Sequence, residues 1–120
     1  MTSIYDQTPC TLGEGPLWHP ERGELFWFDI LARRLHAKGQ SWPFEEIVSA
    51  AGWVDDTRLL IASETRFLLF NLNTGTSETV TELEPDRPDT RTNDGRADPY
   101  GGFWIGTMSK AADPRKGTIY

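Results

Sequence analysis

The 120-residue sequence has little cysteine and no long apolar run: its only cysteine is Cys10. One cysteine excludes an intramolecular disulfide and any zinc site built from several cysteines. No stretch approaches the roughly 20 apolar residues needed to span a bilayer, and residues 1–7 lack the basic and apolar regions of a signal peptide. We therefore expect a cytoplasmic protein with no membrane partner, in which Cys10 is a small, semi-buried thiol.

A basic surface is also missing. Asp and Glu number 18 against 12 Lys and Arg, which gives a net charge of −6, and the arginines are scattered among carboxylates. Binding a phosphate backbone needs clustered basic side chains, so nucleic acid is not an expected partner. The chain has no G-x-S-x-G elbow, Walker loop or dinucleotide fingerprint. Serine-type and nucleotide-dependent chemistry therefore have no support.

Helical periodicity is nearly absent, whereas short β-prone runs between turns are frequent. With 38% hydrophobic residues, the chain can bury a core. Strands buried on both faces are expected at 24–30, 58–63 and 102–106. Two further strands are expected at 66–72 and 76–83, joined by Asn73-Thr74-Gly75, with the second alternating as a half-exposed outer strand. The pattern predicts an all-β protein.

The three buried strands look related, because each follows a short polar turn and they recur at intervals of tens of residues. Four short strands repeated every 40 to 50 residues or so are typical of a β-propeller blade, although a sandwich or a meander gives similar local signals. A propeller needs at least four blades of about this length, and residues 1–120 supply two and part of a third. We expect the N-terminal part of one incomplete propeller domain, in which residues 117–120 enter a further strand.

Glu14 stands in the segment Gly13-Glu14-Gly15-Pro16, at the entry to a strand. The glycines allow a close backbone approach and the proline stiffens the turn. A carboxylate fixed at such a rim can bind a hard divalent cation through oxygen. The spacing alone is equally that of a solvated turn glutamate.

Arg91 and Asn93 occupy alternate positions of one extended segment, so their side chains point to the same face. A guanidinium and a carboxamide on one face suit a hydroxylated ligand, since arginine donates hydrogen bonds while asparagine both donates and accepts. Taken alone, Asn93-Asp94-Gly95 also has the composition of an ordinary turn.

Together, the segments Gly13-Glu14-Gly15-Pro16 and Arg91-Thr92-Asn93-Asp94-Gly95 resemble the gluconolactonase/regucalcin family of sugar-lactone hydrolases. The resemblance covers residues 12–120 and implies a six-bladed β-propeller of which this chain forms the first two to three blades. It implies that Glu14 binds one divalent metal ion (Ca, Zn, Mn or Mg) and that Arg91 and Asn93 contact the substrate. Asp94 is expected to hold the loop as a structural partner.

The activity that the resemblance implies is hydrolysis of an aldonolactone to the sugar acid. In that family, an asparagine and an aspartate from later blades complete the metal site, and the general base is expected beyond Tyr120. Residues 1–120 alone are therefore expected to be inactive without the missing C-terminal part of the propeller. Two alternatives remain open, namely a non-catalytic propeller that binds calcium or a partner protein, and an organophosphate or aryl-ester hydrolase on the same fold.

Other polar and aromatic residues have weaker signals. The family-like segment Gly106-Thr107-Met108 is interpreted as pocket wall. Some relatives place a substrate-contacting glutamate just after it, where this chain has Ser109-Lys110-Ala111-Ala112, so Lys110 or Asp113 is left with a different role. His19 is expected in a turn and His36 on a strand surface. The five tryptophans are expected to pack in the core: Trp18, Trp27, Trp42, Trp53 and Trp104.

Overall fold

The computed structural model describes residues 1–120, which form ten antiparallel β-strands. The strands are β1 Gly13–His19, β2 Glu24–Asp29, β3 Arg34–Ala37, β4 Gln40–Pro43, β5 Val48–Trp53, β6 Arg58–Ser63, β7 Arg66–Asn71, β8 Ser77–Glu82, β9 Thr90–Ala97 and β10 Phe103–Ser109. The all-β prediction is confirmed. None of the secondary structure is a helix of the length and apolar character that crossing a membrane requires.

The strands form three sheets in chain order: β1-β2-β3-β4, β5-β6-β7-β8 and β9-β10. The strands predicted at 24–30, 58–63 and 102–106 are β2, β6 and β10, which occupy the same second place in their sheets. The repeat inferred from the sequence is therefore real. Burial on both faces is wrong for β10, because only alternate residues of that strand are buried and Trp104 is exposed. Gly106 of β10 also forms an isolated antiparallel bridge to Ile119, which lies outside the ten strands.

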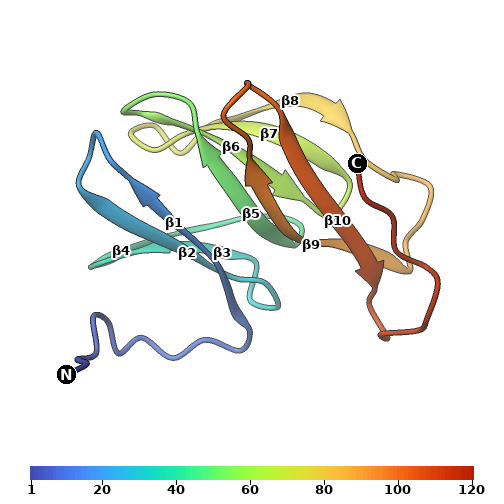
Figure 1. Ribbon diagram of the computed structural model, residues 1–120, viewed down its shortest axis with the longest axis horizontal. Coiled ribbons are helices and arrows are strands. Elements are labelled where there is room, and N and C mark those ends of the chain that lie inside the picture. The colour runs from blue at the N-terminus through green and yellow to red at the C-terminus, as the bar shows by residue number, and fades with distance from the viewer.

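Figure 1 shows the three sheets fanned side by side, with β1, β5 and β9 nearest one another. The middle sheet is apolar on both faces. Successive residues of a strand point to opposite sides, so neighbouring residues of β5 and β6 pack in different clusters. Ala51 and Ile61 pack in the larger core cluster with Phe26 and Phe28 of the first sheet, whereas Ala50 and Ala62 pack in the second cluster with Ile105 of the third. Sheets stacked in this way are the blades of a partial β-propeller, as predicted.

The outer strand β8 differs from the prediction, because all six of its residues are exposed instead of alternating. The tryptophan prediction is also wrong in part. Trp18, Trp53 and Trp104 are 57%, 41% and 59% exposed. The turn after β9 holds Trp104 outside the core, because the indole Nε1 donates a 3.0 Å hydrogen bond to Oδ2 of Asp98.

Both histidine predictions are corrected as well. His19 is the last residue of β1 and is fully buried, and its Nε2 donates a 2.7 Å hydrogen bond to the backbone carbonyl of Asp55. It therefore ties the first sheet to the β5–β6 turn. His36 does lie in a strand, β3, but it is only 8% exposed and stacks on Trp27.

Candidate functional site

The inner strands β1, β5 and β9 each carry a β-bulge. The register shifts lie between Glu14 and Leu17, between Val48 and Ala50, and opposite the Ile105–Thr107 segment of β10. Each inner strand therefore has one residue more than its partner, which bends the strand and re-aims the side chains beside it. The bulges involve the two sequence segments that predicted a site, together with Ser49.

Close packing joins these bulges. Gly15 has φ +60°, and its backbone approaches β5 so closely that a Cβ atom there would lie 2.3 Å from the Ser49 carbonyl oxygen. The Ser49 hydroxyl donates a buried 2.7 Å hydrogen bond to Oγ1 of Thr92 in β9, and the Thr92 hydroxyl donates to the Ser63 carbonyl. The first strands of all three sheets are thus fixed relative to one another, which keeps their polar side chains in place.

Glu14 lies in β1, immediately before its bulge, and is exposed. None of the ion pairs of the structure includes its carboxylate. Gly15 cannot be replaced cheaply by a larger residue, so the sequence around Glu14 is constrained by packing on Ser49. The arrangement leaves the carboxylate oxygens free to bind a cation or to accept a hydrogen bond from outside the protein.

Arg91 and Asn93 lie on the same face of β9, as their spacing predicts. Nη1 of Arg91 donates 3.0 Å hydrogen bonds to Oδ1 of Asn93 and to the Thr92 carbonyl. Arg91 is only 8% exposed, yet no carboxylate forms an ion pair with it. Burial lowers the pKa of its guanidinium, an effect that the charge of Glu14 partly opposes. Asn93-Asp94-Gly95 lies within the bulged strand β9, so the interpretation of this segment as a turn is wrong.

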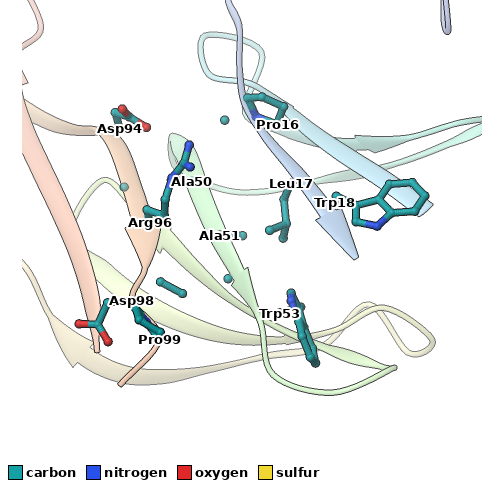
Figure 2. A pocket seen from close by; sticks show the side chains of 14 residues that line it. Pro16, Leu17, Trp18, Ala50, Ala51, Trp53, Asp94, Arg96, Asp98 and Pro99 are labelled. Atoms are coloured by element: carbon teal, nitrogen blue, oxygen red, sulfur yellow. The ribbon is translucent and has the colours of Figure 1, made fainter. Parts of the chain in front are cut away.

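A cavity of about 630 Å³ lies between the three inner strands (Figure 2). Its walls come from residues 15–18, 50–53 and 94–99. Asp94 lines this cavity and is exposed, and the structure gives its carboxylate neither a hydrogen bond to the loop nor an ion pair. The expectation that Asp94 holds the loop is therefore wrong. Glu14, Arg91 and Asn93 lie next to the cavity along the same strands, not in its wall.

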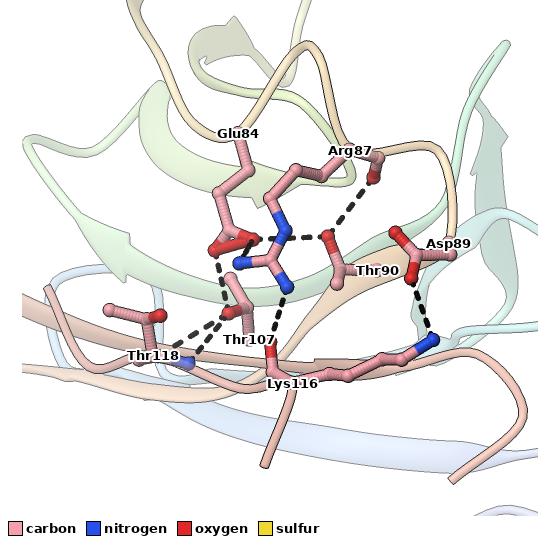
Figure 3. A network of polar contacts seen from close by, with 7 residues as sticks. All are labelled: Glu84, Arg87, Asp89, Thr90, Thr107, Lys116 and Thr118. Carbon is pink, nitrogen blue, oxygen red and sulfur yellow. Dashed lines mark hydrogen bonds and ion pairs between the residues drawn. The ribbon is translucent and has the colours of Figure 1, made fainter. Parts of the chain in front are cut away.

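Thr107, interpreted as pocket wall, belongs to a polar network that joins β9 and β10 to the loop between β8 and β9 (Figure 3). Its hydroxyl donates a 2.7 Å hydrogen bond to Oε2 of Glu84, whose other oxygen accepts from Thr90 and pairs with Arg87. Burial alone would raise the pKa of Glu84, but these hydrogen bonds outweigh it and the pKa is lowered. Lys110 pairs with Glu64 at 2.5 Å, and Asp113 accepts from Ser109. These contacts hold the segments before β9 and after β10, and none of these residues lines the cavity.

Sequence reasoning missed Ser49, which links the other two bulges. A signal was available, because Ser49-Ala50-Ala51-Gly52 is a run of four small residues inside a strand. Small side chains in a strand often mark a place where another backbone comes close. Here that backbone is Gly15. Gly52, in the same run, lies against the side chains of Phe103 and Ala97 of the third sheet.

Comparisons with known proteins show which chains this one is similar to. Residues 12–120 match the model of the SMP-30/Gluconolactonase/LRE-like region. The chain is 36% identical to an L-arabinolactonase of Azospirillum brasilense, covering 95% of this chain and 40% of that protein. It is 35% identical to a pentonolactonase of Haloferax volcanii, covering 90% and 38%.

A crystal structure of a calcium-binding protein, regucalcin, from Agrobacterium tumefaciens has a TM-score of 0.91 and 40% identity to this chain. The alignment covers 96% of this chain and 41% of that one. The chain thus spans about 40% of the length of the proteins it matches.

Proposed function

Because this chain belongs to the SMP-30/Gluconolactonase/LRE-like family, we propose that the complete protein hydrolyses a sugar lactone to the corresponding sugar acid. Relatives named for lactonase activity on different sugars support this reaction class. In the reaction, the oxygen of water bonds to the lactone carbonyl carbon, the ring C–O bond breaks, and a carboxylic acid and a hydroxyl group result. The protein must therefore orient the ring and balance negative charge on the carbonyl oxygen.

The observation that carries the proposal is the buried, unpaired guanidinium of Arg91. A buried charge without a counter-ion is costly, so its retention favours a functional role. Nη1 is occupied by Asn93 and the Thr92 carbonyl, which leaves the donors on Nη2 and Nε for a ligand. Asn93 uses its Oδ1 on Arg91 and keeps its amide hydrogens for donation. Together they provide hydrogen-bond donors on one face for the oxygens of a lactone.

Glu14 is proposed to hold one divalent metal ion. Its exposed carboxylate, with no ion pair inside the protein, fits the oxygen ligand that hard cations require. When bound, such a cation polarises a carbonyl and stabilises negative charge on its oxygen. The charge of Glu14 also reaches Arg91, so the metal ligand and the substrate residues share one electrostatic environment.

The remaining parts of the site are proposed to come from outside residues 1–120. Glu14 belongs to no group of three or more histidine, cysteine or acidic side chains at metal-ligand spacing. The proteins that this chain matches are more than twice as long. We therefore propose that residues 1–120 are the N-terminal part of one propeller domain, and that the other metal ligands and the general base belong to later blades.

The test is hydrolysis of a panel of aldonolactones by the complete protein. Turnover is measured through the proton release that accompanies acid formation. Metal-free protein is assayed first, and each of Ca, Zn, Mn and Mg is then added back. Turnover of a sugar lactone that needs added metal supports the proposal. Absence of turnover with every lactone and every metal contradicts it.

Calcium binding without catalysis is the second candidate, since the structural relative is named as a calcium-binding protein. Calorimetry on the same metal-free protein separates the two candidates. Calcium binding together with no lactone turnover would favour the binding protein, whereas turnover of aryl esters or organophosphates in place of lactones would favour the other hydrolase class.

A further inference from the structure

Cys10, Asp29 and His36 form a cluster on the first sheet, where Asp29 is paired with Gly13 just before the bulge of β1. One potential ligand atom from each residue lies within 4.8 Å of those of the other two. Asp29 ends β2 and is 3% exposed, and its Oδ2 and Oδ1 accept hydrogen bonds from the backbone amides of Thr11 (2.8 Å) and Leu12 (3.0 Å). These bonds position Cys10 beside the β2–β3 pair.

Each member of the cluster has a free lone pair. His36 is 8% exposed and its ring stacks on Trp27 with centroids 5.7 Å apart and 9° between the planes, but its nitrogens make no hydrogen bond. Cys10 makes only a long 4.0 Å contact to the Thr8 carbonyl. Oδ2 of Asp29 accepts one hydrogen bond, so a lone pair remains. No buried side-chain nitrogen or oxygen lacks a partner, so the His36 nitrogens that make no hydrogen bond keep access to an external ligand.

We propose that Cys10, Asp29 and His36 bind a zinc-class divalent cation, separate from the metal ion proposed at Glu14. Thiolate, imidazole and carboxylate together are a zinc donor set, whereas calcium and magnesium prefer oxygen ligands alone. Three protein ligands suffice for a tetrahedral site whose fourth ligand is water. Glu14 is not a member of this cluster.

The cation would act as a clamp on the chain that leads to Glu14. Thr11 and Leu12, which Asp29 holds, directly precede the segment that carries Glu14, and the Leu12 carbonyl accepts from Ile30 N at 3.0 Å. A metal bound by Cys10, Asp29 and His36 would tie Cys10 to β2 and β3, just before the segment that carries Glu14. The cation would thereby stabilise the first sheet and the position of Glu14.

The test is protection of Cys10 from alkylation in the complete protein, read by mass spectrometry of the peptide that contains Cys10. Zinc is expected to slow the modification of wild-type protein, and calcium is not. The variant His36→Gln is expected to lose the protection. Changes in outer-shell partners already cost about 10- to 100-fold in metal affinity, so removal of a ligand should cost at least as much.

Glu14→Gln is the matched control, because it removes the other proposed metal ligand and should leave zinc protection of Cys10 intact. Cobalt provides a second measurement that needs no alkylation: the wild type should give thiolate-to-cobalt absorption, and Cys10→Ser should lack it. Equal alkylation of Cys10 with and without zinc overturns the proposal. Protection that survives in His36→Gln overturns it too, since the thiol would then bind zinc without this cluster.

Discussion

Gly15 and Ser49 touch through their backbones: a Cβ atom at Gly15 would lie 2.3 Å from the Ser49 carbonyl oxygen. Gly15 also has φ +60°, a conformation that other residues adopt only with strain. We expect Gly15→Ala to destabilise the complete protein, because the strands β1 and β5 must separate to admit a methyl group. The measurement is the midpoint of denaturant unfolding.

Gly23→Ala is the matched control, since Gly23 has φ +59° and a Cβ atom at that position would have nothing within 4 Å. Both substitutions carry the same backbone cost, of order 1 kcal/mol. The excess loss in Gly15→Ala therefore reports the contact with Ser49, and we expect it to exceed about 1 kcal/mol. Equal losses in the two variants would show that the inner strands separate freely.

Glu14→Gln is expected to weaken divalent-metal binding and to abolish lactone hydrolysis with little change in folding. The substitution removes charge and keeps volume at an exposed position, and hard cations need the charge. Calorimetry with the metal that supports turnover is the measurement. Glu21→Gln, at an exposed turn residue, is the control and should behave as wild type. Unchanged metal affinity in Glu14→Gln would remove Glu14 from the proposed site.

Arg91→Ala and Asn93→Ala are expected to impair turnover of sugar lactones and to leave metal affinity unchanged. Loss of a charge-assisted contact costs roughly 1.5 to 3 kcal/mol, which is about ten- to a hundredfold in kcat/KM. Steady-state kinetics and calorimetry are measured side by side, with the exposed Asn73→Ala as control. A parallel fall in metal affinity would place these residues in the coordination of the ion or in the folding of β9.

Asp55 predicts a component of acid stability. A hydrogen bond from the Arg58 side chain and the backbone amide of Thr57 lower its pKa from 3.8 to about 2. A lowered pKa in the folded state stabilises the protein above the ordinary aspartate pKa, and this stabilisation is lost as pH falls from about 4 towards 2. Asp55→Asn should therefore flatten the pH dependence of the melting temperature over that range, whereas Asp56→Asn should not. Identical pH profiles for wild type and Asp55→Asn would contradict this.

The sequence predicted the repeat better than the position of individual side chains. Strand and turn signals recur in each sheet, so the correspondence of β2, β6 and β10 follows from the residues alone. The exposure of Trp18 and Trp53 does not, because it depends on which face of an inner strand meets the cavity between sheets. Similarly, burial of His19 depends on its hydrogen bond to Asp55, 36 residues away.

At the site, local spacing could place Arg91 and Asn93 on one face, because a strand alternates with a period of two. Spacing could not reveal that Arg91 is buried without an ion pair, since that depends on packing by other sheets. Asp94 was misjudged for a related reason: the bulge in β9 changes the direction of the residues around it. The roles of Glu14, Arg91 and Asn93 remain predictions.

The Ser49–Thr92 hydrogen bond is expected to couple β5 to β9 energetically. Ser49→Ala removes a donor and leaves the Thr92 hydroxyl bonded to the Ser63 carbonyl, so it should cost about 1 kcal/mol. Thr92→Val should cost more, about 1 to 3 kcal/mol, because it leaves the buried Ser49 hydroxyl without its acceptor and also removes the donor to the Ser63 carbonyl.

A double-mutant cycle on unfolding of the complete protein tests this coupling. Thr74 and Thr76 are the matched control pair, since their hydroxyls are also 2.7 Å apart but lie exposed, where water replaces the lost partner. We expect an interaction energy of at least about 0.5 kcal/mol for Ser49 and Thr92, and a value near zero for the control. Additive effects of Ser49→Ala and Thr92→Val would mean that the inner strands are held by packing alone, and that the hydroxyl pair does not fix the bulges that carry the proposed site.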